Sequence, residues 1–361
     1  MEPATPASPP PPPPPARRTL RIAQVSPLYE SVPPLAYGGT ERIVSYLTEA
    51  LVTEGHRVTL FASPDSHTAA ELISCWDRAL RLDEREPDAA ALHLAMFEDV
   101  KRRADGFDVI HFHTDKLHLP LTRRIPTPSL TTLHGRLDLA GLELLYREFR
   151  EHPLVSISDA QRGPLPSANW VATVHHGLPL TLYSPTTEPG RYLAFIGRVA
   201  PEKGLDRAIS LAHGTGIPLK IAAKVDRADK EYFDKMIKPH IDGSFIEYVG
   251  EIREHEKTRF LGDAAALVFL IDWPEPFGLA MIEAMACGTP VIARRRGSVP
   301  EVVDQGITGF IVEDLHQAVR DVPLALELDR RRCREQFERR FSATRLARDY
   351  LAIYRSLGGS E

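Results

Sequence analysis

The sequence predicts two α/β domains in tandem, each built on a doubly wound, Rossmann-like parallel sheet, facing each other across a cleft. The chain has 361 residues, which is longer than a single hydrophobic core usually grows. From Leu20 onward, short runs rich in Val, Ile and Leu alternate with longer helical patterns, as expected for buried parallel strands joined by helices. The alternation stops once and then restarts, so we expect two sheets.

The expected domain boundaries follow these changes of pattern. Residues 1–18 form a proline-rich tail, which we expect to be extended and disordered. Residues 19–177 form the first domain, and three prolines within 178–190 mark a linker. Residues 191–340 form the second domain. The last segment, 341–361, carries a helical stripe that packs on its own domain or crosses back to the first, and its spacing leaves both possibilities open.

Each domain supplies six expected strands. Those of the first domain lie at 20–26, 57–63, 108–113, 129–134, 154–158 and 171–176. Those of the second domain lie at 192–197, 218–225, 244–250, 265–271, 290–293 and 309–312. The helix after the first strand is clear, because one stripe carries Ile43, Val44, Leu47, Ala50 and Leu51.

Composition excludes several classes of protein. A net charge of −5 and a pI near 6.3 offer no general attraction for nucleic acid or an anionic membrane. The three cysteines, Cys75, Cys287 and Cys333, are far apart, as expected in a reducing compartment. No apolar run reaches the roughly 18 residues of a membrane span, and the N-terminus lacks the apolar region of a secretory signal. We therefore expect a cytoplasmic protein without an integral membrane segment.

The stretch "EPFGLAMIEAMACGTPVIA" (275–293) carries only two charges, Glu275 and Glu283. If residues 279–287 form a helix, the neighbours of Glu283 on its face are small or apolar. An unpartnered buried carboxylate costs several kcal/mol or takes up a proton. Glu283 therefore needs a polar partner, and an absent ligand is one candidate.

Other residues of the chain are suited to binding a phosphate group. Gly38 and Gly39 precede the first long helix, so the backbone can approach an anion near the helix N-terminus. Arg198 and Lys203 follow the first strand of the second domain, where two cations can neutralise a diphosphate. Either pattern alone also fits an ordinary turn or solvated surface cations.

Histidines cluster in the first domain, with His134 at the end of an expected strand. We expect His134 at the rim of the cleft as a hydrogen-bond partner for substrate, although a histidine satisfied within the core fits the same pattern. The chain has no acidic D-x-D pair and no H-E-x-x-H motif. We therefore expect no metal ion.

With these motifs together, the sequence resembles the family 4 glycosyltransferases, which are retaining enzymes of the two-domain GT-B fold. The stretch from Glu275 to Glu283 is similar to the E-x7-E signature of the family, and "G-x-P-V-I-A" follows it. "GRVAPEKG" (197–204) and "AYGGTER" (36–42) resemble further family motifs in the expected order. The resemblance covers nearly the whole chain after the tail.

The resemblance implies roles for particular residues in binding the sugar of the donor. Glu275, with the backbone of Phe277 and Gly278, would hold hydroxyls of the donor sugar, and Leu279 completes this part of the site. His134 is similar to a histidine of the family that lies near the reacting sugar.

The same resemblance implies where the nucleotide part of the donor binds. Glu283 would accept hydrogen bonds from the ribose hydroxyls, which would satisfy its buried carboxylate. Arg198 and Lys203 would bind the diphosphate, and Gly38 with Gly39 would close over it from the other domain. The backbone around Gly250 and Ile252 would hold the base.

The implied function is transfer of a hexose, with retention, from a nucleotide diphosphate sugar to an unidentified hydroxyl of a small molecule, glycan or lipid. A UDP-hexose is the expected donor, with GDP-mannose as second choice, and no cofactor is expected. Retention would proceed by front-face displacement without a metal ion.

Other functions fit the same kind of fold. A GT-B epimerase or phosphorylase and a non-catalytic sugar-nucleotide binding protein remain alternatives. An NAD-dependent oxidoreductase is less suitable, because the glycine fingerprint is missing after both first strands. The sequence leaves the acceptor and the oligomeric state open.

Overall fold

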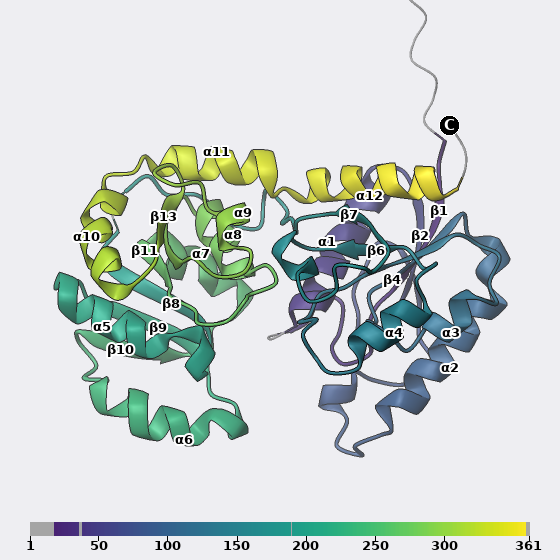
Figure 1. Cartoon of the computed structure of the whole chain (residues 1–361), viewed down its shortest axis with the longest axis horizontal. Helices are drawn as coiled ribbons and strands as arrows, with labels where there is room; N and C mark the ends of the chain where they lie inside the picture. The colour runs from purple at the N-terminus through teal and green to yellow at the C-terminus, as the bar shows by residue number, and fades with distance from the viewer. Residues whose placement is uncertain (1–17, 36–37, 189, 359–361) are drawn as a thin grey trace, which may run out of the picture.

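The computed structural model describes residues 18–35, 38–188 and 190–358, which form two α/β domains side by side (Figure 1). Each domain contains one parallel sheet, so the predicted pair of doubly wound domains is confirmed. The proline-rich tail lies outside the described residues except for Arg18, and so do Ala36 and Tyr37 of the "AYGGTER" motif. Within the described ranges, no helix combines the length and apolar character that a bilayer span requires.

The N-terminal sheet has seven strands in the order β3-β2-β1-β4-β5-β6-β7. All six strands expected from the sequence are present. The seventh, β3, is an edge strand of three residues that are exposed or half-buried, so it lacks the apolar run by which the others were recognised. The strands are β1 (Arg21–Val25), β2 (Arg57–Phe61), β3 (Glu71–Ile73), β4 (Val109–Phe112), β5 (Ser129–Thr132), β6 (Leu154–Ser156) and β7 (Trp170–Thr173).

The C-terminal sheet has six strands in the order β10-β9-β8-β11-β12-β13, and all six were expected. They are β8 (Tyr192–Arg198), β9 (Leu219–Lys224), β10 (Ile246–Gly250), β11 (Ala264–Phe269), β12 (Val291–Arg294) and β13 (Gly309–Val312). The strand order reverses beside β1 in the first sheet and beside β8 in the second. The carboxyl ends of strands at such reversals form the crevice where α/β sheets bind ligands.

The helices pack their apolar stripes against these sheets. The stripe predicted for α1 is real, since Ile43, Val44, Leu47 and Leu51 are all buried. The α-helices are α1 (Gly39–Thr53), α2 (Ala89–Arg102), α3 (Leu119–Thr122), α4 (Leu142–Glu148), α5 (Leu205–Thr215), α6 (Lys230–Tyr232), α7 (Glu254–Gly262), α8 (Leu279–Ala286), α9 (Val299–Val302), α10 (Leu315–Leu326), α11 (Arg330–Arg340) and α12 (Ala343–Leu357).

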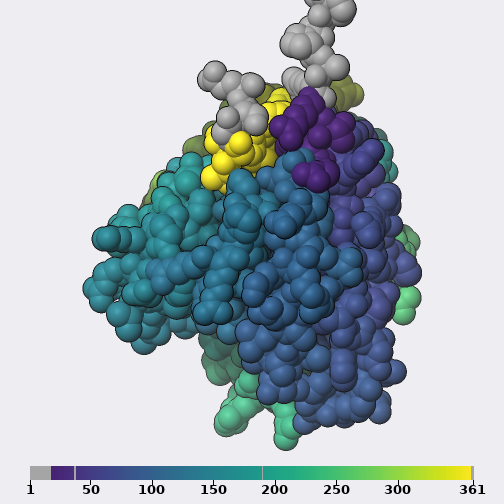
Figure 2. All heavy atoms as spheres, turned by 90° about the vertical axis from the view of Figure 1, so that its right-hand side faces the viewer, coloured from purple at the N-terminus to yellow at the C-terminus, as the bar shows by residue number. Residues whose placement is uncertain are grey.

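Helix α12 crosses from the C-terminal domain to the N-terminal one, where it packs on α1 (Figure 1). The crossing is held by Leu178, whose N–H donates to Phe341 O and whose carbonyl accepts from Ala343 N–H, each at 2.8 Å. Arg345 then donates to the carbonyl of His176 at 2.8 Å. In Figure 2 the end of α12, in yellow, lies beside the first described residues, in purple. The chain therefore passes twice between the domains at one place.

Candidate active site

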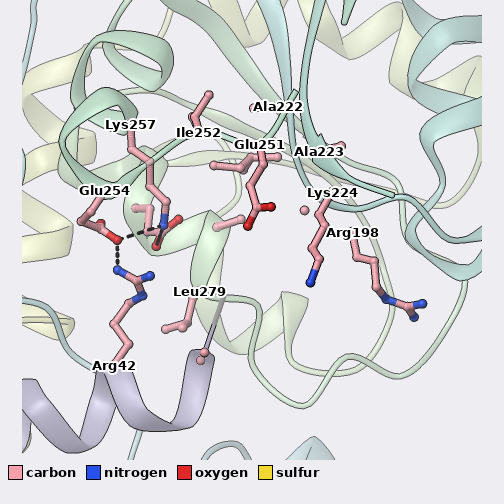
Figure 3. Close-up of a pocket in the computed structure, with 16 residues that line it drawn as sticks. Arg42, Arg198, Ala222, Ala223, Lys224, Glu251, Ile252, Glu254, Lys257 and Leu279 are labelled. Atoms are coloured by element: carbon pink, nitrogen blue, oxygen red, sulfur yellow. Dashed lines mark hydrogen bonds and ion pairs between the residues drawn. The ribbon is translucent and has the colours of Figure 1, made fainter. Parts of the chain in front are cut away.

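The carboxyl ends of the two sheets face a cleft that contains two adjoining cavities. The larger cavity, about 900 Å³, is lined by the loops after β1, β4 and β5 and by those after β8 and β11. The smaller cavity, about 200 Å³, lies between α7, α8 and the ends of β8 and β9 (Figure 3). Four residues line both cavities and so mark their junction: Gly38, Gly39, Arg198 and Leu279.

Two helices begin at this junction, one from each domain. A Cβ atom on Gly39, the first residue of α1, would lie 3.8 Å from the Cδ1 atom of Leu279, the first residue of α8. A side chain at Gly38 would clash with Pro34, and Gly278 has φ 82° with a Cβ position 2.9 Å from Phe269. The glycines thus let both positive helix ends face one point, where an anion is favoured.

Glu275 and Lys203 form an ion pair in the wall of the larger cavity. The Lys203 ammonium lies 2.5 Å from the Glu275 carboxylate, and the indole N–H of Trp273 donates to the same oxygen at 2.9 Å. The Lys203 Nζ atom also lies 4.8 Å from the centre of the Trp273 ring. Phe277, Gly278 and Leu279 line the same cavity. The expected sugar-binding residues are therefore together, with one cation among them.

Arg198 lines both cavities, but its guanidinium group is held by carboxylates. It donates to Glu202 at 2.6 Å and makes a second ion pair with Asp229. In Figure 3 its guanidinium group extends away from the centre of the pocket. The sequence placed Arg198 correctly at the end of the strand, but these acidic partners were not expected.

Glu283 is 4% exposed, as its sequence context predicted, and it has a partner within the chain. Lys257 of α7 lies 2.8 Å from its Oε1 atom. Lys257 also lies 3.4 Å from Glu254, which pairs with Arg42 of α1 in the other domain (Figure 3). Burial opposes ionisation of Glu283, but the two cations outweigh it and keep its pKa below the ordinary value. A ligand is therefore not needed to explain why this carboxylate is buried.

Sequence reasoning missed Arg42, Glu254 and Lys257. Arg42 stands three residues after the Gly-Gly pair, and α7 reads as an ordinary charged surface helix, so only the tertiary structure brings them to Glu283.

The far end of the smaller cavity is formed by small residues of β9 and by the segment after β10. Ala222, Ala223 and Ile252 line it. Gly250, with φ 82°, is not among the lining residues. The segment expected to hold a base thus reaches the cavity through Ile252.

Comparisons with known proteins identify the family of this chain. The family model described as Glycosyltransferase Family 4 matches residues 37–199, and the one described as Glycosyl transferases group 1 matches residues 184–340. This chain belongs to glycosyltransferase family 4.

Relatives of the glycosyltransferase include a glycogen synthase of Mycobacterium tuberculosis, with 26% identity over 93% of this chain and 95% of the relative. A D-inositol 3-phosphate glycosyltransferase of Mycolicibacterium smegmatis is 26% identical over 52% of this chain and 46% of its own. Among solved structures, a glycosyltransferase involved in avilamycin A biosynthesis matches with a TM-score of 0.73 and 24% identity, over 94% of this chain and 99% of that one. An Anabaena protein, HepE, in complex with UDP and glucose matches with a TM-score of 0.72 and 15% identity, over 93% of this chain and 100% of that one. These structures share the GT-B fold.

His134 of the glycosyltransferase lines the larger cavity, as the sequence predicted. It is half-buried, and its ring stacks on that of His176 with 5.3 Å between centroids. Burial lowers the pKa of His134 to about 3, so the ring is neutral near neutral pH. Among the described residues, its Nδ1 atom has no hydrogen-bond partner.

A buried chain of hydrogen bonds connects His134 to α12. The Nε2 atom of His134 lies 2.9 Å from His113 Nδ1, and His113 Nε2 lies 2.8 Å from the side-chain oxygen of Gln24. The Gln24 amide donates to the Tyr354 hydroxyl at 2.9 Å. Because the Gln24 oxygen accepts, His113 Nε2 carries the proton and His113 Nδ1 must accept from His134 Nε2–H. His134 Nδ1 is then a free acceptor.

The same helix supplies a second hydroxyl that lies further from the cleft. Tyr354 continues the chain to His111 Nδ1 at 2.7 Å, and His111 Nε2 lies 2.7 Å from the Thr132 hydroxyl. Thr132 in turn bonds Tyr350 at 2.7 Å. Tyr350 therefore ends the chain, whereas Tyr354 stands between it and Gln24.

Among the described residues, Glu41 has no partner of opposite charge, whereas Lys203, Arg198 and Glu283 are all paired. Glu41 lines the larger cavity, and its residue surface is 6% exposed. Burial raises its pKa to about 7, and the nearby Glu30 and Asp115 raise it further. A hydrogen bond from its own backbone N–H and the charge of Arg81 oppose this rise. Sequence reasoning missed Glu41, although it lies within the "GGTER" motif. The folded protein keeps this carboxylate in a position that disfavours its charge.

We expect Tyr354→Phe to lower kcat several-fold, because Gln24 loses the acceptor that fixes its orientation and thereby the tautomer of His134. Tyr350→Phe is the matched control on the same helix. Tyr350→Phe should lose about 1–2 kcal/mol of unfolding free energy for its one buried hydrogen bond, and Tyr354→Phe about twice as much for its two. Steady-state kinetics and urea unfolding measure both effects. Equal kcat values for the two variants would show that the hydrogen bonds between Tyr354 and His134 do not affect catalysis.

We expect Glu41→Gln to stabilise the protein at high pH. The carboxyl pKa is about 7 in the folded protein and near 4.5 in the unfolded chain. The wild type therefore loses stability as the pH rises from about 4.5 to about 7, and it does not regain this stability at higher pH. The stability difference between variant and wild type should therefore grow by up to about 3 kcal/mol between roughly pH 4 and pH 8. Urea unfolding at both pH values measures it, with Glu49→Gln of α1 as control. A pH-independent difference would disprove the raised pKa.

Proposed function

We propose that this glycosyltransferase transfers a hexose, with retention of configuration, from a UDP-hexose to a hydroxyl acceptor without a metal ion. The observation that carries this proposal is the Lys203–Glu275 pair at 2.5 Å beside the N-terminus of α8. The pair lines the larger cavity, and Leu279, the first residue of α8, lies at the junction with the smaller one. One cation, one sugar-binding carboxylate and a helix dipole thus converge at one point.

In the proposed complex, the nucleoside lies in the smaller cavity and the sugar in the larger one. Glu283 accepts hydrogen bonds from ribose hydroxyls beside Lys257. The diphosphate lies at the junction, against the starts of α1 and α8 and within reach of Lys203 and Arg198. Glu275 and the backbone of Phe277 and Gly278 hold the hexose hydroxyls.

The reaction follows from these contacts. As the bond between the anomeric carbon and the diphosphate oxygen breaks, the sugar becomes oxocarbenium-like and negative charge grows on the diphosphate. Lys203 and the positive helix ends stabilise that charge. The acceptor hydroxyl attacks from the face that the diphosphate leaves, and its proton passes to a phosphate oxygen, so the configuration is retained. The neutral His134 accepts a hydrogen bond from a hydroxyl near the anomeric carbon.

The choice of donor is supported by the Anabaena protein with the same fold that was solved with UDP and glucose. GDP-mannose is the next donor to test. The balance of charge and the three separated cysteines support a cytoplasmic location.

We expect Lys203→Ala and Glu275→Ala to fold like the wild type and to lose about 10²- to 10³-fold in kcat, the usual loss when one group that stabilises transition-state charge is removed. The measurement is nucleotide release with a panel of nucleotide sugars and mixed acceptors. Chelation of divalent cations should leave the rate unchanged. Lys230→Ala, a surface lysine paired with Asp234, is the control.

Three outcomes would contradict the proposal. Loss of turnover on chelation with recovery on metal addition would disprove the metal-free mechanism. Nucleotide release that does not depend on an acceptor would favour an epimerase or phosphorylase. Tight binding of a nucleotide sugar without turnover would favour a binding protein.

A further inference from the structure

The N-terminal wall of the larger cavity has an excess of carboxylates. Its two arginines are matched, since Arg81 lies 2.9 Å from Glu30 and Arg136 lies 2.7 Å from Asp138. Glu41 and Asp115 line the same wall. Among the described residues, neither of these two carboxylates makes a side-chain hydrogen bond or ion pair with another residue. The wall opposite the donor-binding domain is therefore acidic.

Glu41 is the stronger of the two indications of a ligand. The residue is only 6% exposed, yet it borders a cavity of about 900 Å³. A buried carboxylate without a partner costs stability, and the cavity is large enough, at the upper end of roughly 300–1,000 Å³ for small-molecule sites, to hold a second molecule beside a hexose. The Glu41 carboxylate accepts a hydrogen bond from its own backbone N–H, and a hydroxyl that donates to it would provide a partner from outside the residue.

The wall also offers an aromatic surface. Tyr29 follows β1, lines the cavity and is 44% exposed. An exposed aromatic ring presents a flat apolar face with a polar end. Together with two acceptor carboxylates, this combination suits a ring that carries hydroxyls on its edge and C–H groups on its face.

We propose that the acceptor is a neutral, polyhydroxylated ring, such as a sugar residue or cyclic polyol, whose hydroxyls donate to Glu41 and Asp115 while Tyr29 covers one face. The proposal rests on the proposed transferase function and specifies its acceptor. An acceptor that carries a phosphate or carboxylate is disfavoured, because its charge would meet two carboxylates and the diphosphate of the donor. Hydroxyl donors avoid that repulsion.

The test compares matched acceptors. Methyl hexopyranosides are offered together with their phosphate esters and uronates, using whichever nucleotide sugar turns over in the donor panel. We expect the neutral member of each set to react at least about tenfold faster than its charged counterparts, since like charges in contact cost more than 1.4 kcal/mol.

Variants of Glu41 and Asp115 test whether these residues bind the acceptor and exclude charged acceptors. Glu41→Gln and Asp115→Asn should each raise the acceptor KM about tenfold, leave the donor KM unchanged and reduce the discrimination against charged acceptors. Glu49→Gln, a charge removal on the same helix outside the cavity, should change neither KM. A loss of folding would be visible in urea unfolding, where Glu41→Gln should be at least as stable as the wild type.

The proposal is overturned if charged acceptors react as fast as neutral ones, if no neutral ring accepts a sugar, or if the variants change the donor KM instead of the acceptor KM. Calorimetric binding of UDP-hexose, without acceptor, is measured separately. If UDP-hexose fails to bind while another nucleotide sugar is turned over with the expected preference for neutral acceptors, the proposed donor is wrong and the acceptor proposal stands.

Discussion

The buried ion pair between Lys257 and Glu283 is the constraint on which the geometry of the cleft depends. Neither charge is tolerated inside the protein without the other, and the pair is joined through Glu254 to Arg42 of the opposite domain. This network connects α1 with α7 and α8 across the cleft. Because it holds α1 against the C-terminal domain, the first turns of α1 and α8 face each other at the junction of the two cavities. The site for an anion follows from that position.

Buried polar groups in this enzyme fall into two kinds. In the hydrogen-bond chain from His134 to Tyr350, each member from His113 to Thr132 has a partner on either side, so its neutral histidines stabilise one arrangement. Among the described residues, Glu41 has no such partner besides its own backbone N–H, and its burial costs stability, which natural proteins accept mainly at functional sites. Glu41 and His134 line the same cavity. In our proposal, a hydroxyl of the acceptor donates to the Glu41 carboxylate.

The sequence predicted most of the fold because each strand carries its own signal. Of the thirteen strands in the described residues, twelve appeared as apolar runs. Only β3 was not recognised, because this edge strand is exposed or half-buried and carries no apolar run, whereas β6, of equal length, is fully buried. The burial of Glu283 was also readable from its small neighbours. Its partner was not, because Lys257 lies 26 residues away on a helix whose sequence looks solvated. Glu41 was missed for a related reason, since a glutamate in the first turn of a helix normally faces water.

Paired charges in the cleft explain how cations for a diphosphate are kept there at a small cost in stability. Lys203 shares its charge with Glu275, and Arg198 shares its charge with Glu202 and Asp229. In the proposed complex, the diphosphate takes up part of the Lys203 charge while sugar hydroxyls donate to Glu275, so both groups remain compensated before and after binding. Little reorganisation is then needed as charge develops on the leaving group. On the N-terminal wall, Glu41 and Asp115 form no such ion pairs among the described residues. In our proposal, this difference is the reason why the charged donor binds to the C-terminal domain and a neutral acceptor to the N-terminal domain.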